Sequence, residues 1–368
     1  MSDRVLSVGE LNRALLERQS LAARTTAPAG DMIERLIGMQ AQVPNAPYVG
    51  LWSRLEGFDP QELADMMTSR EAVRMSLMRV TLHLVTARDC LLLRPAVQTV
   101  MDRVLSSGGV WGRQLVGADL EAVAAAGREL LEDEPRTTAA LGSALHERWP
   151  AFDAAALAHA VRFTVPMVQL PPRGVWGMGG RAVWTTVRSW LGSETGAYAP
   201  PDDLVLRYLR AFGPATIADV RAWSGLTGLK EVVERLRPEL RTFRDSRGRE
   251  LFDLPGAPLP DADTPAPPRF LPEFDTVLVA HDDRARVFPD EHRQRIVRDL
   301  GSLMVLVDGM IAATWRIERS RGSAALVITP FRRLPRGERE PLLEEARGLL
   351  GFIAPGADHD VRIAPPEA

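Results

Sequence analysis

Residues 201–255 read PDDLVLRYLRAFGPATIADVRAWSGLTGLKEVVERLRPELRTFRDSRGRELFDLP. The acidic pair after Pro201 predicts the start of a first helix, and Gly213-Pro214 ends it. Thr216 with Asp219 three residues later is a variant of the capping box, which predicts a short second helix over residues 217–223. Apolar residues spaced by three, one and three positions predict a third helix over residues 226–236.

A β-hairpin is predicted directly after these helices, over residues 240–254. Its polar turn is Asp245-Ser246-Arg247-Gly248, and aromatic and aliphatic residues flank the turn. Three helices followed by a hairpin form the element order of a winged helix. This stretch therefore predicts one winged-helix unit.

The same order of elements is predicted twice more upstream, although the chain carries no literal sequence repeat. The second copy is predicted to hold three helices and two strands, over residues 119–131, 136–149, 152–165, 167–170 and 181–190. The first copy is predicted to hold four helices and one strand, over residues 8–17, 31–39, 48–55, 60–69 and 75–85.

The C-terminal region follows a proline-rich linker, residues 256–268. Beyond the linker, Asp308-Gly309 is a strong signal for a hairpin turn. Strands are predicted over residues 276–280, 302–307, 311–318 and 324–330, and a closing helix over residues 338–350. We interpret this region as a β-rich module or small barrel, which serves either as a structural cap or as a DNA-contacting part.

The predicted fold class is therefore α+β, with three tandem winged-helix units followed by the C-terminal β module. The predicted boundaries are 1–115, 116–198 and 199–258 for the three units and 259–368 for the module. Three units in one chain can surround a duplex without a second copy, so we expect a monomer.

The chain of 368 residues is 45% hydrophobic and 25% charged, as in an ordinary globular protein. Its formal net charge of −3 counts against a protein that coats DNA, although the distribution of charge matters more. Every basic residue except Lys230 is an arginine, which a genome rich in G and C also favours. No apolar run is long enough to span a bilayer and no signal-peptide pattern opens the chain, so we expect a cytoplasmic protein without a membrane partner.

Several common catalytic patterns are missing from the sequence. It contains no Gly-rich phosphate loop after a strand, no Gly-x-Ser-x-Gly and no His-Glu-x-x-His. The six histidines do not stand at metal-ligand spacing. Cys90, the single cysteine, excludes an internal disulfide and lies in an apolar stretch typical of a core. We therefore expect neither a metal nor a cofactor.

Two glutamines stand out at the end of the helix predicted to close near Met39. Pro44 and Pro47 prevent the helix from continuing. In an extended backbone Gln40 and Gln42 point to the same side, where two neutral amides can read a base edge or hold a water molecule beside a sugar. The alternative is a polar helix-to-loop junction whose glutamines are simply solvated.

Three motifs in order resemble one known family. Gln40-Ala41-Gln42 looks like the Gln-x-Gln motif of the AlkZ/YcaQ-like winged-helix DNA glycosylases. Residues 78–85 look like their Arg-x-Thr-x-His-Leu strand. Residues 270–275, followed by Asp282-Asp283-Arg284, look like their Leu-Pro-x-aromatic-Asp and Asp-Arg signature.

The resemblance implies a monofunctional DNA glycosylase that releases N7-alkylated purines, with Gln40 and Gln42 as the catalytic residues. Its implied partner is double-stranded DNA carrying alkylated purines, and the two-glutamine form is linked to antibiotic self-resistance. Bulky adducts and interstrand crosslinks are among the implied substrates, and the protein would then act at the nucleoid. The alternative is a non-catalytic winged-helix DNA-binding protein, such as a transcription regulator.

The implied chemistry suits two neutral amides. A purine alkylated at N7 is cationic, so it leaves without a general acid, and a neutral amide is too weak a base to replace that activation. No lysine stands near the motif to form a Schiff base, which favours simple hydrolysis over strand-cleaving lyase chemistry.

Arg79, Thr81 and His83 alternate within one predicted strand, so we expect them on one face. They would support the glutamine loop or contact the DNA backbone. The alternative for His83 is a hydrogen-bonded, half-buried histidine of an apolar strand.

Two further groups of charged residues are candidates. The hairpin arginines are candidates for phosphate contact, with a solvated hairpin as the alternative: Arg241, Arg244, Arg247 and Arg249. Three residues of the C-terminal motif either form an internal ion pair, which is the interpretation we favour, or flank the site: Asp275, Asp282 and Arg284.

Overall fold

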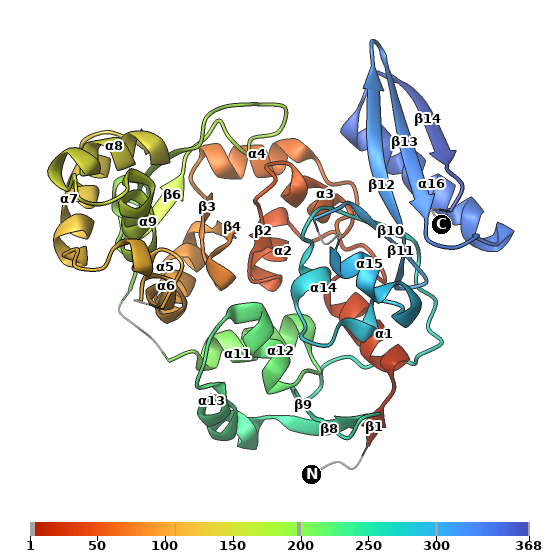
Figure 1. The fold of residues 1–368 in the computed structure, drawn as a ribbon. Coiled ribbons are helices and arrows are strands. Elements are labelled where there is room, and N and C mark those ends of the chain that lie inside the picture. The colour runs from red at the N-terminus through yellow and green to blue at the C-terminus, as the bar shows by residue number, and fades with distance from the viewer. Residues whose placement is uncertain (1–3, 107, 197–199, 299–300, 367–368) are drawn as a thin grey trace.

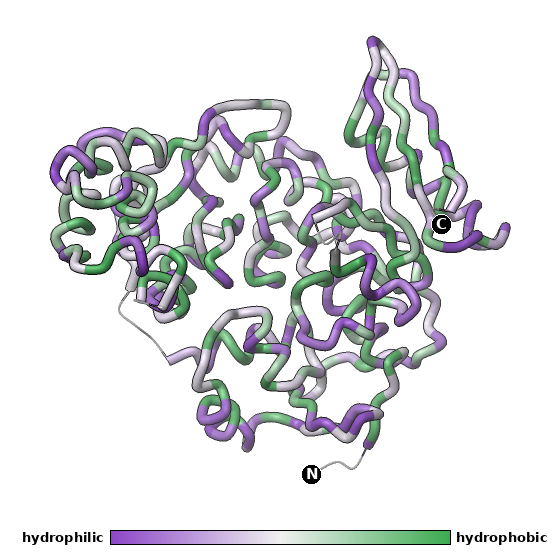
Figure 2. The backbone as a smooth tube through the Cα atoms, in the orientation of Figure 1, coloured by the Kyte–Doolittle hydropathy of each residue, from purple (hydrophilic) through white to green (hydrophobic). Residues whose placement is uncertain are grey.

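The computed structural model describes residues 4–106, 108–196, 200–298 and 301–366, and its fold is mixed α and β (Figure 1). Its strands form three sheets of six, five and three strands. Hydrophilic and hydrophobic residues are mixed along the helical coils (Figure 2), as expected for helices that bury one face and expose the other. One hydrophobic cluster contains residues from distant parts of the chain, among them Leu15, Val123, Tyr208 and Met304.

The first helix of the N-terminal region forms where the sequence predicts one, and Ser7 and Glu10 cap its start in a capping box. Its elements are β1 (Val5–Leu6), α1 (Val8–Arg18), α2 (Ala29–Arg35), β2 (Met39–Gln40), α3 (Ala46–Trp52), α4 (Pro60–Thr68), β3 (Ala72–Ser76), η1 (Met78–Val80), β4 (Leu82–Thr86), α5 (Ala87–Ala96) and α6 (Gln98–Leu105). Two predictions fail here. The helix expected to reach Met39 ends at Arg35, and the single strand over 75–85 is a hairpin of two strands.

The middle region holds the three helices predicted for it. Its elements are η2 (Gly112–Gln114), α7 (Leu120–Asp133), β5 (Arg136–Thr137), α8 (Thr138–Arg148), α9 (Ala154–Thr164), β6 (Met167–Gln169), β7 (Val183–Thr186) and α10 (Val187–Leu191). Asp119, Thr137 and Asp153 cap the three helices through their side chains. The strand predicted over 181–190 is shorter, because Thr186 caps α10.

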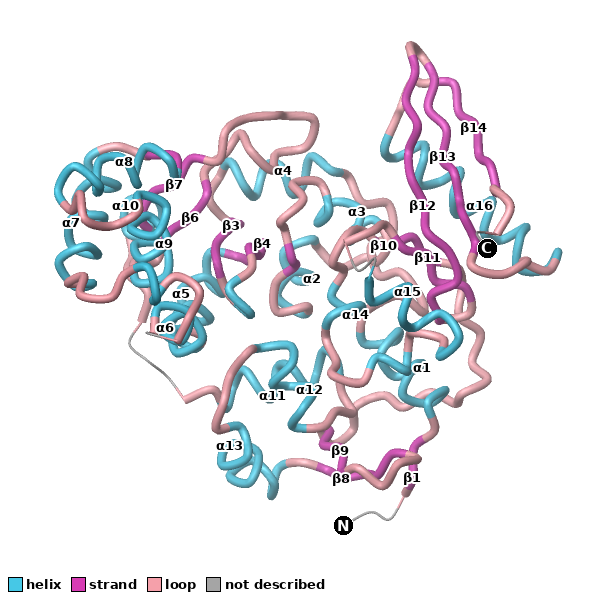
Figure 3. Tube along the Cα trace, in the orientation of Figure 1, coloured by secondary structure: helices cyan, strands magenta, loops and turns pink. Residues whose placement is uncertain are grey.

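Residues 202–253 form the elements predicted for them. They are α11 (Asp202–Phe212), α12 (Ile217–Ser224), α13 (Leu229–Leu236), η3 (Arg237–Glu239), β8 (Arg241–Asp245) and β9 (Glu250–Asp253). The Thr216 and Asp219 capping box is formed, and the strands pair in antiparallel fashion about the predicted turn. The segment from β9 to residue 268 is loop, as the prolines predict (Figure 3).

The C-terminal region is an open sheet rather than a barrel, since the described strands run in the order β10-β11-β12-β13-β14 and β14 pairs only with β13. Its elements are β10 (Arg269–Leu271), α14 (Thr276–Val279), η4 (Arg284–Arg286), η5 (Asp290–His292), α15 (Arg293–Arg298), β11 (Met304–Val307), β12 (Met310–Ser320), β13 (Ser323–Pro330), α16 (Arg336–Ile353) and β14 (Asp358–Ile363). The hairpin of β12 and β13 projects from the rest of the molecule (Figure 1). The strand predicted over 276–280 is wrong, because Asp275 caps helix α14 there.

The six-stranded sheet places β2 at one edge. Its order is β2-β4-β3-β6-β7-β5, so strands from the N-terminal and middle regions share it. Gln40 of β2 pairs with His83 of β4. The sheet therefore brings two of the sequence motifs side by side.

Two buried ion pairs tie the N-terminal region to later parts of the chain. Arg18 bonds both carboxylate oxygens of Asp253, at 2.7 and 3.0 Å. Arg54 bonds both oxygens of Asp275, at 2.8 and 2.7 Å, and their side chains are 0% and 2% exposed. Each pair is satisfied by two parallel hydrogen bonds, the geometry that suits an arginine and a carboxylate.

Removing one partner of the Arg54 pair should destabilise the fold strongly. In Arg54→Met, Asp275 remains as a buried carboxylate without its counter-ion, and we expect the free energy of unfolding to fall by about 3–5 kcal/mol. Urea denaturation measures this loss. Arg336→Met is the control, because the Arg336–Glu340 pair is exposed; equal losses in the two variants would contradict the prediction.

Candidate active site

The two glutamines meet at the end of the edge strand. Gln40 belongs to β2 and is 7% exposed, whereas Gln42, just beyond the strand, is exposed to solvent. Nε2 of Gln40 donates a hydrogen bond to Oε1 of Gln42 at 2.5 Å. The backbone is extended here, and the two amides lie on one side, as the sequence predicts. The pair is thus anchored in the sheet at one end and open to solvent at the other.

Arg79 does not share a strand face with Thr81 and His83, so that expectation is wrong. It lies in the η1 turn between β3 and β4 with a φ of 52°. The turn forms because the Leu77 and Met78 carbonyls accept the N–H groups of Val80 and Thr81. From this turn, Arg79 Nη2 donates to Gln40 Oε1 at 3.0 Å, and Nη1 donates to the Trp223 carbonyl of α12.

These contacts form one chain of hydrogen bonds. Arg79 donates to Gln40, and Gln40 donates to Gln42. The oxygen of Gln40 is occupied by a cation, so its NH2 group is the part left to face Gln42. The last member, Gln42, keeps its own NH2 group and a second lone pair on its oxygen for a ligand.

His83 is a buried, neutral histidine beside this chain. Nδ1 of His83 lies 3.0 Å from the Thr81 carbonyl oxygen and 3.5 Å from Thr81 Oγ1. Burial first, and the charge of Arg79 second, lower the pKa of His83 to about 3. His83 therefore carries no proton to donate as an imidazolium at neutral pH.

The arginines around the site are held by neutral oxygens. Besides Arg79, Arg103 of α6 donates to the Gly225 carbonyl at the end of α12. Burial, and then the charge of Arg284, lower the pKa of Arg79 to about 10, which places Arg284 close to the same site. Carbonyl partners do not cancel charge, so Arg79 and Arg103 keep their positive charge, whereas the exposed carboxylate of Asp282 acts on Arg284.

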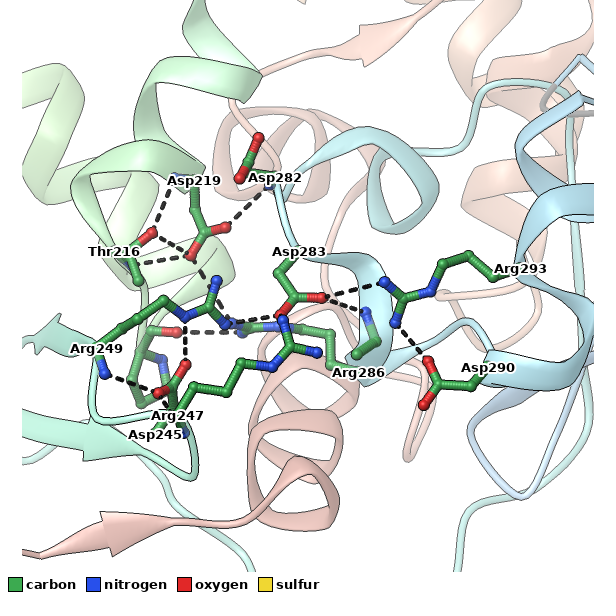
Figure 4. Close-up of polar contacts among 12 residues, drawn as sticks. Thr216, Asp219, Asp245, Arg247, Arg249, Asp282, Asp283, Arg286, Asp290 and Arg293 are labelled. Carbon is green, nitrogen blue, oxygen red and sulfur yellow. Dashed lines mark hydrogen bonds and ion pairs between the residues drawn. The ribbon is translucent and has the colours of Figure 1, made fainter.

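The hairpin arginines are held differently (Figure 4). Arg247 and Arg249 contact Asp283 at 2.9 and 2.7 Å, and Arg249 also contacts Asp245 at 2.6 Å. Arg241 pairs with Asp253 at 3.0 Å. Arg244 is exposed and donates to the Gly248 carbonyl at 2.8 Å. Three of the four arginines therefore have carboxylate partners within the protein.

The three residues of the C-terminal motif do not pair with one another. Asp275 pairs with Arg54 instead, so its role in the fold is structural. Asp282 is exposed, and its backbone N–H donates to Asp219 Oδ1 at 2.9 Å. Arg284 lies 5.8 Å from the ring centre of Phe288 and flanks Arg79. The expected ion pair among the three is therefore not formed as a group: Asp275 pairs with Arg54, whereas the charge of Asp282 acts on Arg284.

Sequence reasoning missed Arg74 of β3. Its guanidinium is buried and donates to the carbonyl of Ala41, the residue between the two glutamines. The one sequence feature that could have indicated its role is a charged residue inside an otherwise apolar strand. Its partners are distant in sequence, so the role of this arginine could not be read from the strand alone.

Among the described residues, neither the cysteine nor a group of metal ligands offers a second reactive site. Cys90 is buried, and burial raises the pKa of its thiol to about 12. The part of the chain with described placement contains no group of three or more His, Cys, Asp and Glu side chains arranged to hold a metal ion. In the same part, every helix is too short or too polar to cross a membrane.

Comparison with known proteins connects this geometry to a family. The family model described as DNA glycosylase AlkZ-like matches residues 33–352. A curated relative from Streptomyces sahachiroi, named interstrand DNA cross-link repair glycosylase, is 26% identical over 89% of this chain and 90% of its own. The solved structure of Streptomyces sahachiroi DNA glycosylase AlkZ matches with a TM-score of 0.78 at 22% identity, over 98% of this chain and 100% of that chain.

The buried His83 should make stability depend on pH. Its folded pKa of about 3 lies below its ordinary value of 6.5, so the unfolded chain binds a proton that the folded protein does not. Stability should therefore fall as the pH decreases from 6.5 toward 3, by up to about 1.4 kcal/mol per pH unit. Denaturation at several pH values should show this slope reduced by about that amount in His83→Asn; parallel slopes in the two proteins would refute the assignment.

Proposed function

This chain belongs to the AlkZ-like DNA glycosylase family, and from that premise we propose that it is a monofunctional glycosylase that hydrolyses the N-glycosidic bond of N7-alkylated purines in DNA. The observation that carries the proposal is the hydrogen-bonded pair of Gln40 and Gln42, exposed at one end. No metal or cofactor enters the proposed reaction. The proposal assigns the two glutamines as the catalytic residues.

The proposed mechanism uses the open amide of Gln42. Its oxygen accepts one hydrogen bond from Gln40 and has a second lone pair that can accept an O–H of water. The water oxygen then attacks the sugar carbon C1′ as the bond from C1′ to the purine nitrogen N9 breaks. The electrons of that bond neutralise the cationic base as it leaves, and the water loses its proton to solvent.

The acid-base properties of the site support a positively charged leaving group. Gln40 and Gln42 are neutral, and the pKa values of His83 and Arg79 lie at about 3 and about 10. The amides and the neutral His83 supply no acidic proton at neutral pH, and Arg79 holds its proton too tightly to be an efficient general acid. A base that already carries a positive charge needs no such proton.

The name of the Streptomyces sahachiroi relative supports a wider substrate range. We include interstrand crosslinks and other bulky adducts among the substrates of this chain, in DNA repair or in self-resistance to a genotoxic natural product. Water placement at the sugar, rather than a close fit around the base, would permit such variety.

We further propose that residues 1–115, 116–198 and 199–258 are winged-helix units that surround the duplex as a monomer in the cytoplasm, at the nucleoid, with 259–368 as a closing module. The elements of residues 202–253 support this description best. Phosphate contact is assigned mainly to Arg79, Arg103, Arg284 and the exposed Arg244. Arg247 and Arg249 would reach phosphate only by exchanging their contacts to Asp283.

Single-turnover excision from duplexes carrying N7-methylguanine tests the catalytic assignment. Gln40→Ala and Gln42→Ala should each lower the rate constant on the order of 100-fold, because the water is no longer positioned. Affinity for undamaged duplex should stay within about twofold, because phosphate contacts dominate it. The wild-type rate should be flat from about pH 6 to 8, since the site residues discussed above do not titrate there.

Undamaged and uracil-containing duplexes are the controls, and neither should lose a base. Efficient release of a neutral base would contradict the mechanism. If no alkylated duplex loses a base and the protein binds DNA in a sequence-specific manner, the proposed glycosylase function is wrong and a transcription regulator is supported instead.

The salt dependence of DNA binding tests the assignment of phosphate contacts. Arg284→Gln should lower the slope of log K against log salt by about 1, because one phosphate contact is lost. Arg247→Gln is the matched control, since Arg247 is also solvent-accessible but already contacts Asp283. A change of slope in Arg247→Gln alone would assign phosphate binding to the hairpin instead.

A further inference from the structure

Arg74 lies directly beneath the glutamine loop. It belongs to the middle of β3 and is 1% exposed. Nη2 donates to the carbonyl of Ala41 at 2.5 Å. Nη1 donates to Oε1 of Gln169 in β6 at 2.5 Å and to the carbonyl of Arg173 at 3.3 Å. One guanidinium thus links the loop with the neighbouring hairpin of the same sheet.

The peptide that Arg74 holds joins Ala41 to Gln42. The N–H of Ala41 donates to the Leu82 carbonyl at 2.8 Å, which continues the pairing of β2 with β4. The Ala41 carbonyl points to Arg74. A peptide unit is planar, so fixing this carbonyl also fixes the nitrogen of Gln42. Gln42 itself lies beyond the strand and is exposed.

We propose that Arg74 is a positioning residue for the glycosylase reaction: it fixes the plane of the Ala41–Gln42 peptide and thereby keeps the two amides in contact. This inference rests on the proposed function for its catalytic consequence. Its structural part, the orientation of Gln42, holds independently of any activity.

The surroundings of Arg74 suit this role better than a role in ion pairing. Within the described residues it forms no ion pair, and its three acceptors are neutral oxygens. Burial, and then the charge of Arg173, lower its pKa to about 10, so it is still a cation at neutral pH. Hydrogen bonds from a cation are short and strong, and a planar fork can hold two acceptors that a lysine cannot hold together.

The loop after β6 closes over the guanidinium. Gly174 has a φ of +94°, and a Cβ there would lie 2.8 Å from Arg74 Nη1 and 2.9 Å from Cδ. The hydroxyl of Tyr48 in α3 donates to the Gly174 carbonyl at 3.0 Å, so the loop is held from a second side. Arg74 therefore has little freedom to move away from Ala41.

The test compares Arg74→Met with Arg94→Met. Arg94 is a matched control, because it too is buried, donates to neutral oxygens and has its pKa lowered to about 10 by burial. Its acceptors belong to Gln98 and Phe163 rather than to the glutamine loop. Arg74→Met should lower the single-turnover rate on N7-methylguanine by about 10- to 100-fold, as expected when a reacting group is misplaced by about 1 Å. Affinity for undamaged duplex should change less than about twofold. Arg94→Met should keep the rate.

Arg74→Lys is the conservative variant, and it also covers the case in which Arg74→Met does not fold. It keeps the charge and one donor direction, so it should restore part of the rate without restoring all of it. A rate equal to the wild type in Arg74→Met or in Arg74→Lys would overturn the proposal. An equal loss of rate in Arg94→Met would also contradict the positioning role, because it would show that losing any buried arginine lowers the rate.

A crystal structure of the folded variant separates this inference from the proposed function. We expect the distance from Gln40 Nε2 to Gln42 Oε1 to exceed hydrogen-bond length once Arg74 is replaced. If the wild type releases no alkylated base but the pair separates, the proposed function fails and the positioning role stands. If the wild type is active and the pair stays together in the variant, the positioning role fails and the function stands.

Discussion

The hydrogen bond from Gln40 to Gln42 depends on contacts made below it. Gln40 is fixed by pairing with β4 and by Arg79. The Gln40–Ala41 peptide is then fixed by the Leu82 carbonyl, and the Ala41–Gln42 peptide by Arg74. Two amides on a free loop would each be solvated, because a hydrogen bond between them adds little over bonds to water. The sheet edge and the two arginines make the contact a lasting feature of the surface. The site is therefore a property of the six-stranded sheet rather than of the triplet alone.

Arginines serve two different purposes in this molecule. Those with carboxylate partners, such as Arg54 with Asp275 and Arg249 with Asp283, join distant segments and contribute no net charge. Those with carbonyl partners, such as Arg74, Arg79 and Arg103, also join segments but keep their charge. A net charge of −3 is consequently compatible with local positive charge, because many of the acids are already paired with other arginines.

Local chemistry made part of this structure predictable. The capping box of Thr216 and Asp219, the turn at Asp308-Gly309 and the extended backbone at Gln40 all depend on neighbours in sequence. The turn at Arg79 was missed because Met, Arg and Val carry no turn signal, and a non-glycine residue at positive φ is held by its surroundings. Helix α14 was missed because its apolar, β-branched sequence favours a strand, and only the cap from Asp275 decides otherwise. The Arg74 contacts could not be predicted, since Ala41, which follows β2, and Gln169 of β6 are both distant from Arg74 in sequence.

The electrostatics of the site limit which reaction it can promote. A half-buried cation beside a forming oxocarbenium-like sugar opposes the positive charge that develops there, and Arg79 donates a hydrogen bond to Gln40. A cationic purine changes this balance, because its departure leaves the total charge near the site unchanged and moves the positive charge from the base to the sugar. A neutral purine would instead create a new pair of charges, with no acid among the discussed residues to protonate the leaving base. In the proposed reaction, selectivity therefore comes from the charge already on the substrate, and the protein contributes the placement of one water molecule.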